Sequence, residues 1–310
     1  AANSRHDRVW QPDDSMTVTI KPLHRVFAGE VDGLDLRRPL SVQEAAAIEA
    51  GMDRYAVLVL HGQNISDTQQ AEFSRNFGAL EMPDKVSNIT KDEDRRLAPI
   101  MADISNLDRD NKLFGRDDRH RMFNLGNRLW HSDSSFRAVP SKYSLLSARV
   151  IPEHGGDTEF ADMRAAYDAL DDAARAQIED LVCEHSLLNS RGLLGFTELS
   201  DQERANFKPA RQSLVRRHPV TGRKSIYLSA HAGGIVGWPV PEARIFLRDL
   251  TEEATRPENV YRHVWRQYDL VIWDNRQVMH RAKHFDDVND VRDMRRTTVA
   301  GDAQTAEQAA

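Results

Sequence analysis

Trp130-His131-Ser132-Asp133 is the stretch from which both the fold and the chemistry of this chain can be approached. If this stretch is a β-strand, alternation places His131 and Asp133 on one face and Ser132 on the other. An imidazole and a carboxylate can share one divalent metal ion, and a second imidazole would complete a two-histidine, one-carboxylate set. Such a set leaves three coordination positions open on one side. The tripeptide alone is weak support, because His-x-Asp arises by chance and is more often a surface pair.

Around this stretch, the chain contains many short apolar or alternating runs that are rich in β-branched and aromatic residues, which predict strands. Ser41-x-x-Glu44 and Ser66-x-x-Gln69 predict capping boxes that open helices. Many strands with few helices favour a sandwich or jelly roll over a parallel α/β sheet, and no glycine-rich loop of the Rossmann kind occurs. Two further helices are expected over Met163–Glu184 and Pro241–Ala254. The expected strands are Thr17–Leu23, Ala56–Leu60, Tyr143–Ile151, Thr158–Ala161, Ser213–Arg217, Ser225–Ser229, Leu270–Trp273 and Thr297–Ala300.

The chain of 310 residues fits one large β-rich domain or two smaller domains. We expect residues 1–15 to be a flexible N-terminal extension, residues 16–302 to form a single domain, and residues 303–310 to be a disordered tail. Residues 82–124 are charged and hold only a brief apolar island, so we interpret them as a lid-like insertion before the metal motif. The alternative for the charge run in this segment is a solvated surface loop.

Composition limits the possible partners and location. The net charge is -6 with both signs interspersed, which argues against nucleic acid as a partner. The single cysteine, Cys183, excludes an intramolecular disulfide, and in an expected helix it reads as a buried structural thiol. No apolar run approaches the roughly 20 residues that a membrane span needs. We therefore expect a cytoplasmic protein with no membrane partner. Assembly into a homo-oligomer is compatible with this composition.

The second informative element lies near the C-terminus. His280 follows Trp273-Asp274-Asn275-Arg276 at the end of an expected strand, and Arg292-Asp293-Met294-Arg295-Arg296 comes after it. A 2-oxo acid with a distal carboxylate needs a cation in its pocket, and arginine holds a carboxylate through two parallel hydrogen bonds. Alternation would place Arg292 and Arg296 on one face and Arg295 on the other. The alternative for these arginines is a solvated strand edge.

These motifs, taken in order, resemble the taurine dioxygenase family of Fe(II)- and 2-oxoglutarate-dependent dioxygenases, and within it the 2,4-dichlorophenoxyacetate dioxygenase branch. The resemblance runs from about Thr17 to Asp302 and includes Gly155-Gly156-Asp157-Thr158. It implies a mainly β fold with flanking helices, namely a double-stranded β-helix, which is a cupin-like jelly roll. This agrees with the fold expected from the strand pattern.

The resemblance also implies individual roles. His131, Asp133 and His280 would bind Fe(II). Thr158 and Arg292 would bind the carboxylates of 2-oxoglutarate, with Trp273 packed close to the metal site. Where that branch has a second histidine three residues after His231, this chain has Gly234. For Lys85 and Lys112, the alternative is that each is a solvated lysine of a loop. The residues implied for substrate binding are Arg296, which would face the substrate carboxylate, Ser134, His231, Lys85 and Lys112.

With Fe(II) as cofactor and 2-oxoglutarate and O2 as cosubstrates, the implied reaction is hydroxylation of a small-molecule carboxylate substrate. An aryloxyalkanoate such as 2,4-dichlorophenoxyacetate would give a phenol and glyoxylate, with succinate and CO2. Asp133 favours hydroxylation, because related halogenases have a small residue at that position. One alternative is the same chemistry on a sulfonate, a sulfate ester or another small organic acid. Another alternative is a non-redox metal-binding jelly roll.

Overall fold

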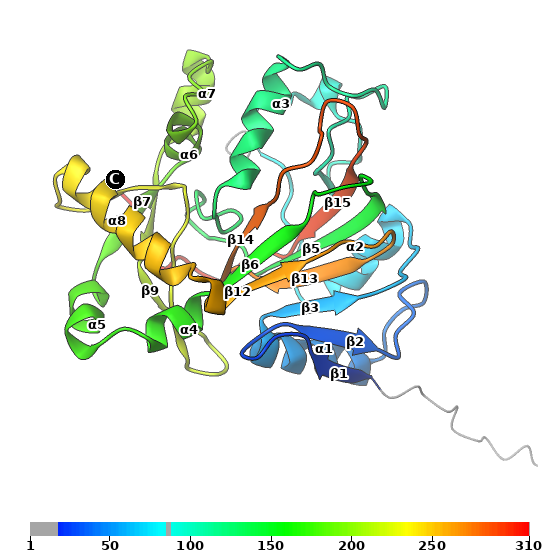
Figure 1. Ribbon diagram of the computed structural model, residues 1–310, viewed down its shortest axis with the longest axis horizontal. Helices are drawn as coiled ribbons and strands as arrows, with labels where there is room; N and C mark the ends of the chain where they lie inside the picture. Colours follow the sequence, from blue (N-terminus) through cyan, green and yellow to red (C-terminus); the bar gives the residue numbers. More distant parts are fainter. Residues whose placement is uncertain (1–17, 85–87, 310) are drawn as a thin grey trace, which may run out of the picture.

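The computed structural model describes residues 18–84 and 88–309. The expected N-terminal extension and Lys85 lie outside these residues. A seven-stranded sheet, in the order β1-β2-β3-β13-β5-β15-β4, lies beside a three-stranded sheet, β12-β6-β14 (Figure 1). A second three-stranded sheet, β11-β7-β8, and the pair β9-β10 lie in the neighbouring part of the molecule. The strands are β1 (Thr19–Pro22), β2 (Gly29–Asp32), β3 (Val57–Leu60), β4 (Ala102–Asp103), β5 (Tyr143–Val150), β6 (Thr158–Asp162), β7 (Val182–His185), β8 (Ala210–Ser213), β9 (Val215–Arg217), β10 (Lys224–Ile226), β11 (Ala232–Ile235), β12 (Val260–His263), β13 (Leu270–Asp274), β14 (Val278–Ala282) and β15 (Asp293–Thr298).

The large sheet is covered on both faces, which explains why its central strands are apolar without interruption. In β13, Leu270 and Ile272 pack into the core that contains the helix residues Ile48 and Phe73. Val271 and Trp273 point the other way, into the core shared with β6. Alternating residues of one strand therefore enter two different cores. Two sheets packed face to face with helices outside form the expected jelly roll.

The helices begin where local sequence signals predict them. Both predicted capping boxes are present: the hydroxyls of Ser41 and Ser66 accept from the backbone three residues later, and Glu44 and Gln69 reach back to the cap. The helices α1 and α2 cover the outer face of the large sheet. The α-helices are α1 (Val42–Tyr55), α2 (Asp67–Arg75), α3 (Arg119–Asn124), α4 (Met163–Asp168), α5 (Asp172–Ile178), α6 (Leu187–Leu193), α7 (Asp201–Asn206) and α8 (Val240–Ala254), with short 3-10 turns at η1 (Asp92–Asp94), η2 (Leu125–Arg128) and η3 (Pro257–Asn259).

The long helix expected over Met163–Glu184 is wrong. The chain instead forms α4, breaks, restarts as α5 with Asp171 as its N-cap, and ends in strand β7. Cys183 therefore lies on a strand, where β7 pairs with β8 and β11. Its thiol is buried, and burial raises its pKa to about 12, which fits the expected structural role. The expected strand Thr297–Ala300 also begins earlier than predicted, because β15 starts at Asp293.

The C-terminal segment differs from the disordered tail that the sequence predicts. Thr305 Oγ1 accepts from the backbone N–H of Ser213 at 3.1 Å, and Gln308 Oε1 accepts from the N–H of Arg211 at 2.9 Å. These bonds attach residues near the C-terminus to β8. Among the described residues, no helix is long and apolar enough to cross a bilayer.

Candidate metal centre and its cavities

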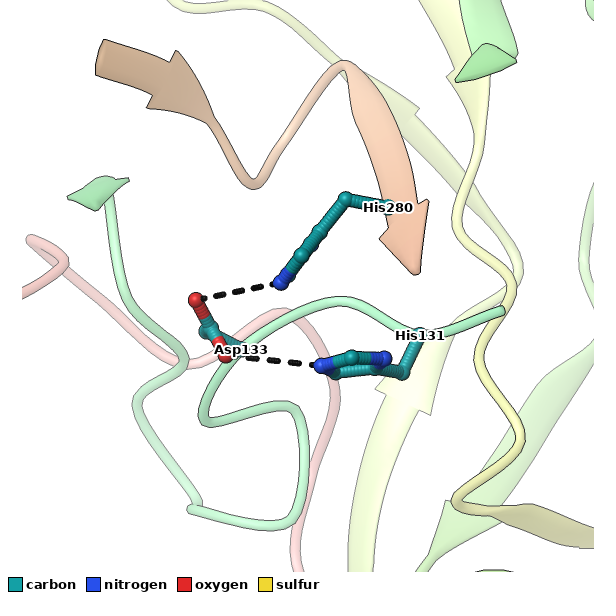
Figure 2. Close-up of side chains that lie close together, drawn as sticks. All are labelled: His131, Asp133 and His280. Atoms are coloured by element: carbon teal, nitrogen blue, oxygen red, sulfur yellow. Dashed lines mark ion pairs between the residues drawn. The ribbon is translucent and has the colours of Figure 1, made fainter. Parts of the chain in front are cut away.

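Two histidines that are far apart in the sequence are held side by side by backbone hydrogen bonds. The N–H of His131 donates to the carbonyl of His280 at 3.0 Å, and the N–H of His280 donates to His131 at 2.9 Å. His280 lies on β14, and Asp133 lies in the turn that follows His131. Figure 2 shows the three side chains pointing toward one another. One ligand atom from each lies within 4.8 Å of the others, and all three residues are buried.

The route by which His131 and Asp133 meet differs from the strand considered in the sequence. His131 takes part only in the isolated bridge with His280, and the chain turns at Asp133. Alternation along a strand therefore does not bring the two side chains together. A one-residue bridge followed by a tight turn does so, and Ser134 in this turn has a left-handed backbone with φ 55°.

Asp133 is oriented by side chains near the end of β13. Its backbone N–H donates to Asn275 Oδ1 at 3.0 Å, and its Oδ2 accepts from Ser144 Oγ at 2.7 Å. Asn275 Oδ1 also accepts from the indole N–H of Trp273 at 3.1 Å. The Trp273 ring lies against His280, with centroids 4.6 Å apart. Hydrogen bonds of this outer layer fix the orientation of the groups that would bind a metal.

The protonation states of the three residues fit a divalent metal ion. His131 Nδ1 lies 2.7 Å from the carbonyl of Leu129, which places the proton on Nδ1 and leaves the Nε2 lone pair facing Asp133. Burial lowers the pKa of His131 and of His280, so both imidazoles are neutral. Burial alone would raise the pKa of Asp133, but the charge of Arg296 and the hydrogen bond from Ser144 hold it below its usual value. Two neutral imidazoles and one carboxylate are the forms that bind metal.

No carboxylate of the described chain is bound to Arg292. Its guanidinium is buried and donates only to the backbone carbonyls of Gly156 and Ile104, at 3.3 and 3.5 Å. Burial lowers its pKa to about 10. Gly156 has φ +74°, and a Cβ there would lie 3.4 Å from Arg292 Nε, so glycine permits this close approach. Arg292 lines a cavity of about 80 Å³ together with Lys283.

Thr158 lies on β6 close to the same small cavity. Its cross-strand partner on β14 is Ala282, which lines the cavity. Thr158 Oγ1 accepts from the indole N–H of Trp265 at 3.0 Å. A hydroxyl can accept one hydrogen bond and still donate its own proton. The proton of Thr158 therefore remains for another acceptor.

A larger cavity of about 390 Å³ opens from the metal centre. His131 and Asp133 line it, and Phe114, Phe123 and Phe136 supply aromatic surface. Much of its lining comes from the segment between residues 82 and 124, the segment interpreted as a lid from the sequence. The cavity thus joins two residues of the metal centre to a wall in which aromatic side chains lie among polar and charged ones.

Comparisons with known proteins agree with this geometry. A model of the family described as "Taurine catabolism dioxygenase TauD, TfdA family" matches residues 19–298. The chain belongs to this family. It is 46% identical to an alpha-ketoglutarate-dependent 2,4-dichlorophenoxyacetate dioxygenase of Cupriavidus pinatubonensis, over 93% of this chain and 99% of that protein. It is 37% identical to an (S)-phenoxypropionate/alpha-ketoglutarate-dioxygenase of Sphingobium herbicidovorans, over 91% and 95% of the two chains.

The structure of this TauD, TfdA family dioxygenase is similar to a solved relative, AAD-2 in complex with Mn(II) and N-oxalylglycine. The TM-score is 0.90 at 57% sequence identity, and the match covers 94% of this chain and 100% of AAD-2. N-Oxalylglycine has the same two carboxylates as 2-oxoglutarate. The Fe(II) and 2-oxoglutarate expected from the sequence are therefore confirmed as the cofactor and cosubstrate of the enzyme, and its donor set fits Fe(II).

The structure places three of the residues implied for substrate binding around the large cavity. Arg296 Nη1 donates to Asp133 Oδ1 at 2.6 Å, so Arg296 forms an ion pair with one of the candidate iron ligands. Ser134 donates to Glu81 Oε2 at 2.7 Å. His231 is buried, and burial keeps its pKa well below the usual value. All three line the cavity.

Two other positions lie away from it. Lys112 is exposed in a turn, where its N–H donates to Asp108 Oδ1 at 2.9 Å, and it does not line either cavity. The structure therefore does not bring Lys112 to the site, and Lys85 lies outside the described residues. Gly234 lies on β11 and is likewise absent from both linings.

Sequence reasoning missed Arg191, which lines the large cavity beside His131 and His231. Leu187, Ser190 and Arg191 are all buried on α6, at the i, i+3 and i+4 spacing of one helix face. The sequence signal that could have identified Arg191 is an arginine on the same helix face as the buried residues Leu187 and Ser190. That signal becomes informative only once the helix is known to face a cavity.

Proposed function

We propose that this enzyme hydroxylates the carbon between the carboxylate and the ether oxygen of an aryloxyalkanoate, such as 2,4-dichlorophenoxyacetate. Replacing one hydrogen on this carbon by hydroxyl gives a hemiacetal. Loss of the hydroxyl proton and cleavage of the bond to the ether oxygen then give glyoxylate and a phenol. Fe(II), when bound, supplies the oxidising chemistry with O2, and 2-oxoglutarate is converted to succinate and CO2.

In this proposal, His131, Asp133 and His280 hold the iron. Arg292 and Thr158 hold the distal carboxylate of 2-oxoglutarate, since Arg292 is a buried cation and the Thr158 proton is not otherwise used. Arg296 binds the substrate carboxylate through the N–H groups that do not contact Asp133. Fixing the carboxylate in this way directs the adjacent carbon toward the metal, and small misplacement would cost a large factor in rate.

The observation that carries the aryl substrate is the group of aromatic side chains in the wall of the cavity. Phe136 packs edge-on against His231, with ring centroids 5.1 Å apart, and Phe123 lies in a cluster with Leu187. A flat apolar ring fits such a wall, and its burial is favourable. A short aliphatic sulfonate would leave this surface exposed to water.

A substrate panel tests the proposal. Purified enzyme with Fe(II), 2-oxoglutarate and O2 is given aryloxyacetates, aryloxypropionates, alkyl sulfonates and alkyl sulfates, and succinate is measured. We expect succinate and phenol in equal amounts from an aryloxy acid. Turnover of a sulfonate or an alkyl sulfate with no aryloxy acid accepted would contradict the substrate assignment. An alkylsulfatase of Acinetobacter baylyi is 30% identical to this chain, so the alkyl sulfates are a necessary part of the panel.

A further inference from the structure

Arg191 is a buried cation in the large cavity. It lies on the face of α6 that also carries Leu187 and Ser190, and only 5% of the residue is exposed. Its guanidinium stacks over the ring of Phe123, with Cζ 4.2 Å from the ring centroid. Gly126 makes room for it, because a Cβ at Gly126 would lie 2.6 Å from Arg191 Cζ. The side chain is therefore fixed in place by its surroundings.

The polar contacts of Arg191 do not satisfy its charge. Nη1 donates to Ser190 Oγ at 3.1 Å, and the same oxygen lies 2.9 Å from His231 Nδ1. The Nε atom is buried and has no hydrogen-bond partner. Within residues 18–84 and 88–309, no carboxylate forms an ion pair with Arg191.

Two other buried arginines of this protein, Arg164 and Arg276, are paired with carboxylates. Arg164 is 1% exposed and binds both carboxylate oxygens of Asp162, at 2.9 and 3.0 Å. Arg276 binds both oxygens of Asp274 in the same way, at 2.9 and 2.7 Å. A buried charge without a partner is costly, and proteins avoid it unless a ligand supplies the partner. Burial lowers the pKa of Arg191 to about 10, so the side chain is still charged at neutral pH.

We propose that Arg191 binds the anionic group of the prime substrate from the α6 wall of the cavity, as a second cation beside Arg296. The inference rests on the proposed function for the identity of the anion, a carboxylate one carbon from the ether oxygen. Arg296 already donates to Asp133, whereas the charge of Arg191 is not used by the protein. The planar fork of Arg191 can hold a carboxylate through two hydrogen bonds. Arg191 is thus a residue that determines specificity for acids over neutral ethers.

The test compares two ligands that differ only in the carboxylate. The enzyme is loaded with Mn(II) and N-oxalylglycine, which prevents turnover, and is titrated calorimetrically with 2,4-dichlorophenoxyacetate and with 2,4-dichloroanisole. We expect Arg191→Met to weaken binding of the acid on the order of 100-fold and to leave binding of the anisole unchanged. Arg191→Lys should retain part of the affinity for the acid, because it keeps a charge at the same wall.

Arg216→Met is a matched control. The Arg216 guanidinium also lies over an aromatic ring, 4.6 Å from the centroid of Tyr227, and its Nη1 is buried without a hydrogen-bond partner. Arg216 does not line the large cavity. This control should bind the acid as the unchanged enzyme does. A structural role for Arg191 would lower the melting temperature of the ligand-free enzyme, whereas we expect Arg191→Met to leave that temperature unchanged or higher.

Three outcomes would overturn the inference. Equal loss of the acid and the anisole would make Arg191 a packing residue of the wall. Unchanged affinity for the acid would remove it from substrate binding. A loss confined to N-oxalylglycine would assign it to the cosubstrate. Hexanesulfonate is titrated in parallel: if only the sulfonate binds, the proposed aryloxy substrate fails, and a 100-fold loss of sulfonate binding in Arg191→Met would still support the role of Arg191.

Discussion

Buried arginines occur in two different settings in this protein, and the contrast separates structure from function. Arg164 lies at the start of α4, and Arg276 lies in the turn between β13 and β14. Each binds both carboxylate oxygens of the aspartate two residues earlier in the chain, and we call these closed pairs. Along the two cavities, Arg191 and Arg292 are as deeply buried, but no carboxylate of the described chain is bound to either. The first pair completes the fold. We propose that the second pair retains its charge for the anions of ligands.

The metal centre should show the largest effect of any change. We expect His131→Ala, Asp133→Ala and His280→Ala each to reduce succinate formation to background, because three protein ligands leave none to spare. Each variant should remain folded and should lose less stability than a variant in which one of the paired arginines has lost its aspartate. The measurements are succinate release, metal content and circular dichroism. Full turnover with unchanged metal content in any variant would remove that residue from the ligand set.

Opening a closed pair should cost folding stability. Asp162→Ala leaves Arg164 buried without its carboxylate, so we expect the free energy of unfolding to fall by about 3–5 kcal/mol. Urea denaturation followed by circular dichroism measures this loss. Asp172→Ala, at a fully exposed position of α5, is the control and should change stability by less than about 0.5 kcal/mol. If the two variants are equally stable, the distinction between the two settings is wrong.

Removing an open arginine should instead cost ligand affinity. We expect Arg292→Ala to weaken 2-oxoglutarate binding by about 2–5 kcal/mol, because a buried carboxylate would lose its cation. The unfolding free energy without 2-oxoglutarate should change far less than in Asp162→Ala. The dependence of succinate formation on 2-oxoglutarate concentration measures the effect. An unchanged dependence would require the cosubstrate anchor to be sought among the neighbouring arginines.

Thr158 should give the smallest effect of the series. We expect Thr158→Val to weaken 2-oxoglutarate binding by about 1–2 kcal/mol, the value of one hydrogen bond to a charged group. The same change leaves the Trp265 N–H without its acceptor, so a modest loss of stability should accompany it. Thr158→Ser keeps the hydroxyl and should restore both quantities. If Thr158→Ser binds 2-oxoglutarate as poorly as Thr158→Val, the hydroxyl is not the group that matters.

Structural features that depend only on residues close together in the sequence could be predicted from the sequence. The caps at Ser41 and Ser66 are formed by residues three positions apart, and both were correctly predicted. The apolar run of β13 indicated a buried strand for the same reason. The strand β7 at the end of the expected helix could not be predicted in this way, because it is a strand only through its pairing with β8 and β11.

The candidate site was predictable to the extent that its ordered motifs matched a family. The meeting of His131 and His280 depends on a backbone bridge between distant segments, which no local pattern shows. The role of Arg191 depends on the packing of α6 against the cavity. The pairing of Arg296 with Asp133 likewise depends on how β15 lies beside the turn at Asp133. Long-range packing decides these contacts.

The most direct measurement is a crystal structure of the enzyme with Mn(II), N-oxalylglycine and 2,4-dichlorophenoxyacetate bound together. We expect the distal carboxylate of N-oxalylglycine to lie within about 3.2 Å of the Arg292 guanidinium, and the aryloxy carboxylate within the same distance of Arg191. Arg164 and Arg276 should keep their aspartates unchanged. A bound complex in which Arg191 and Arg292 contact no ligand anion would contradict the assignment of the open arginines to ligand binding.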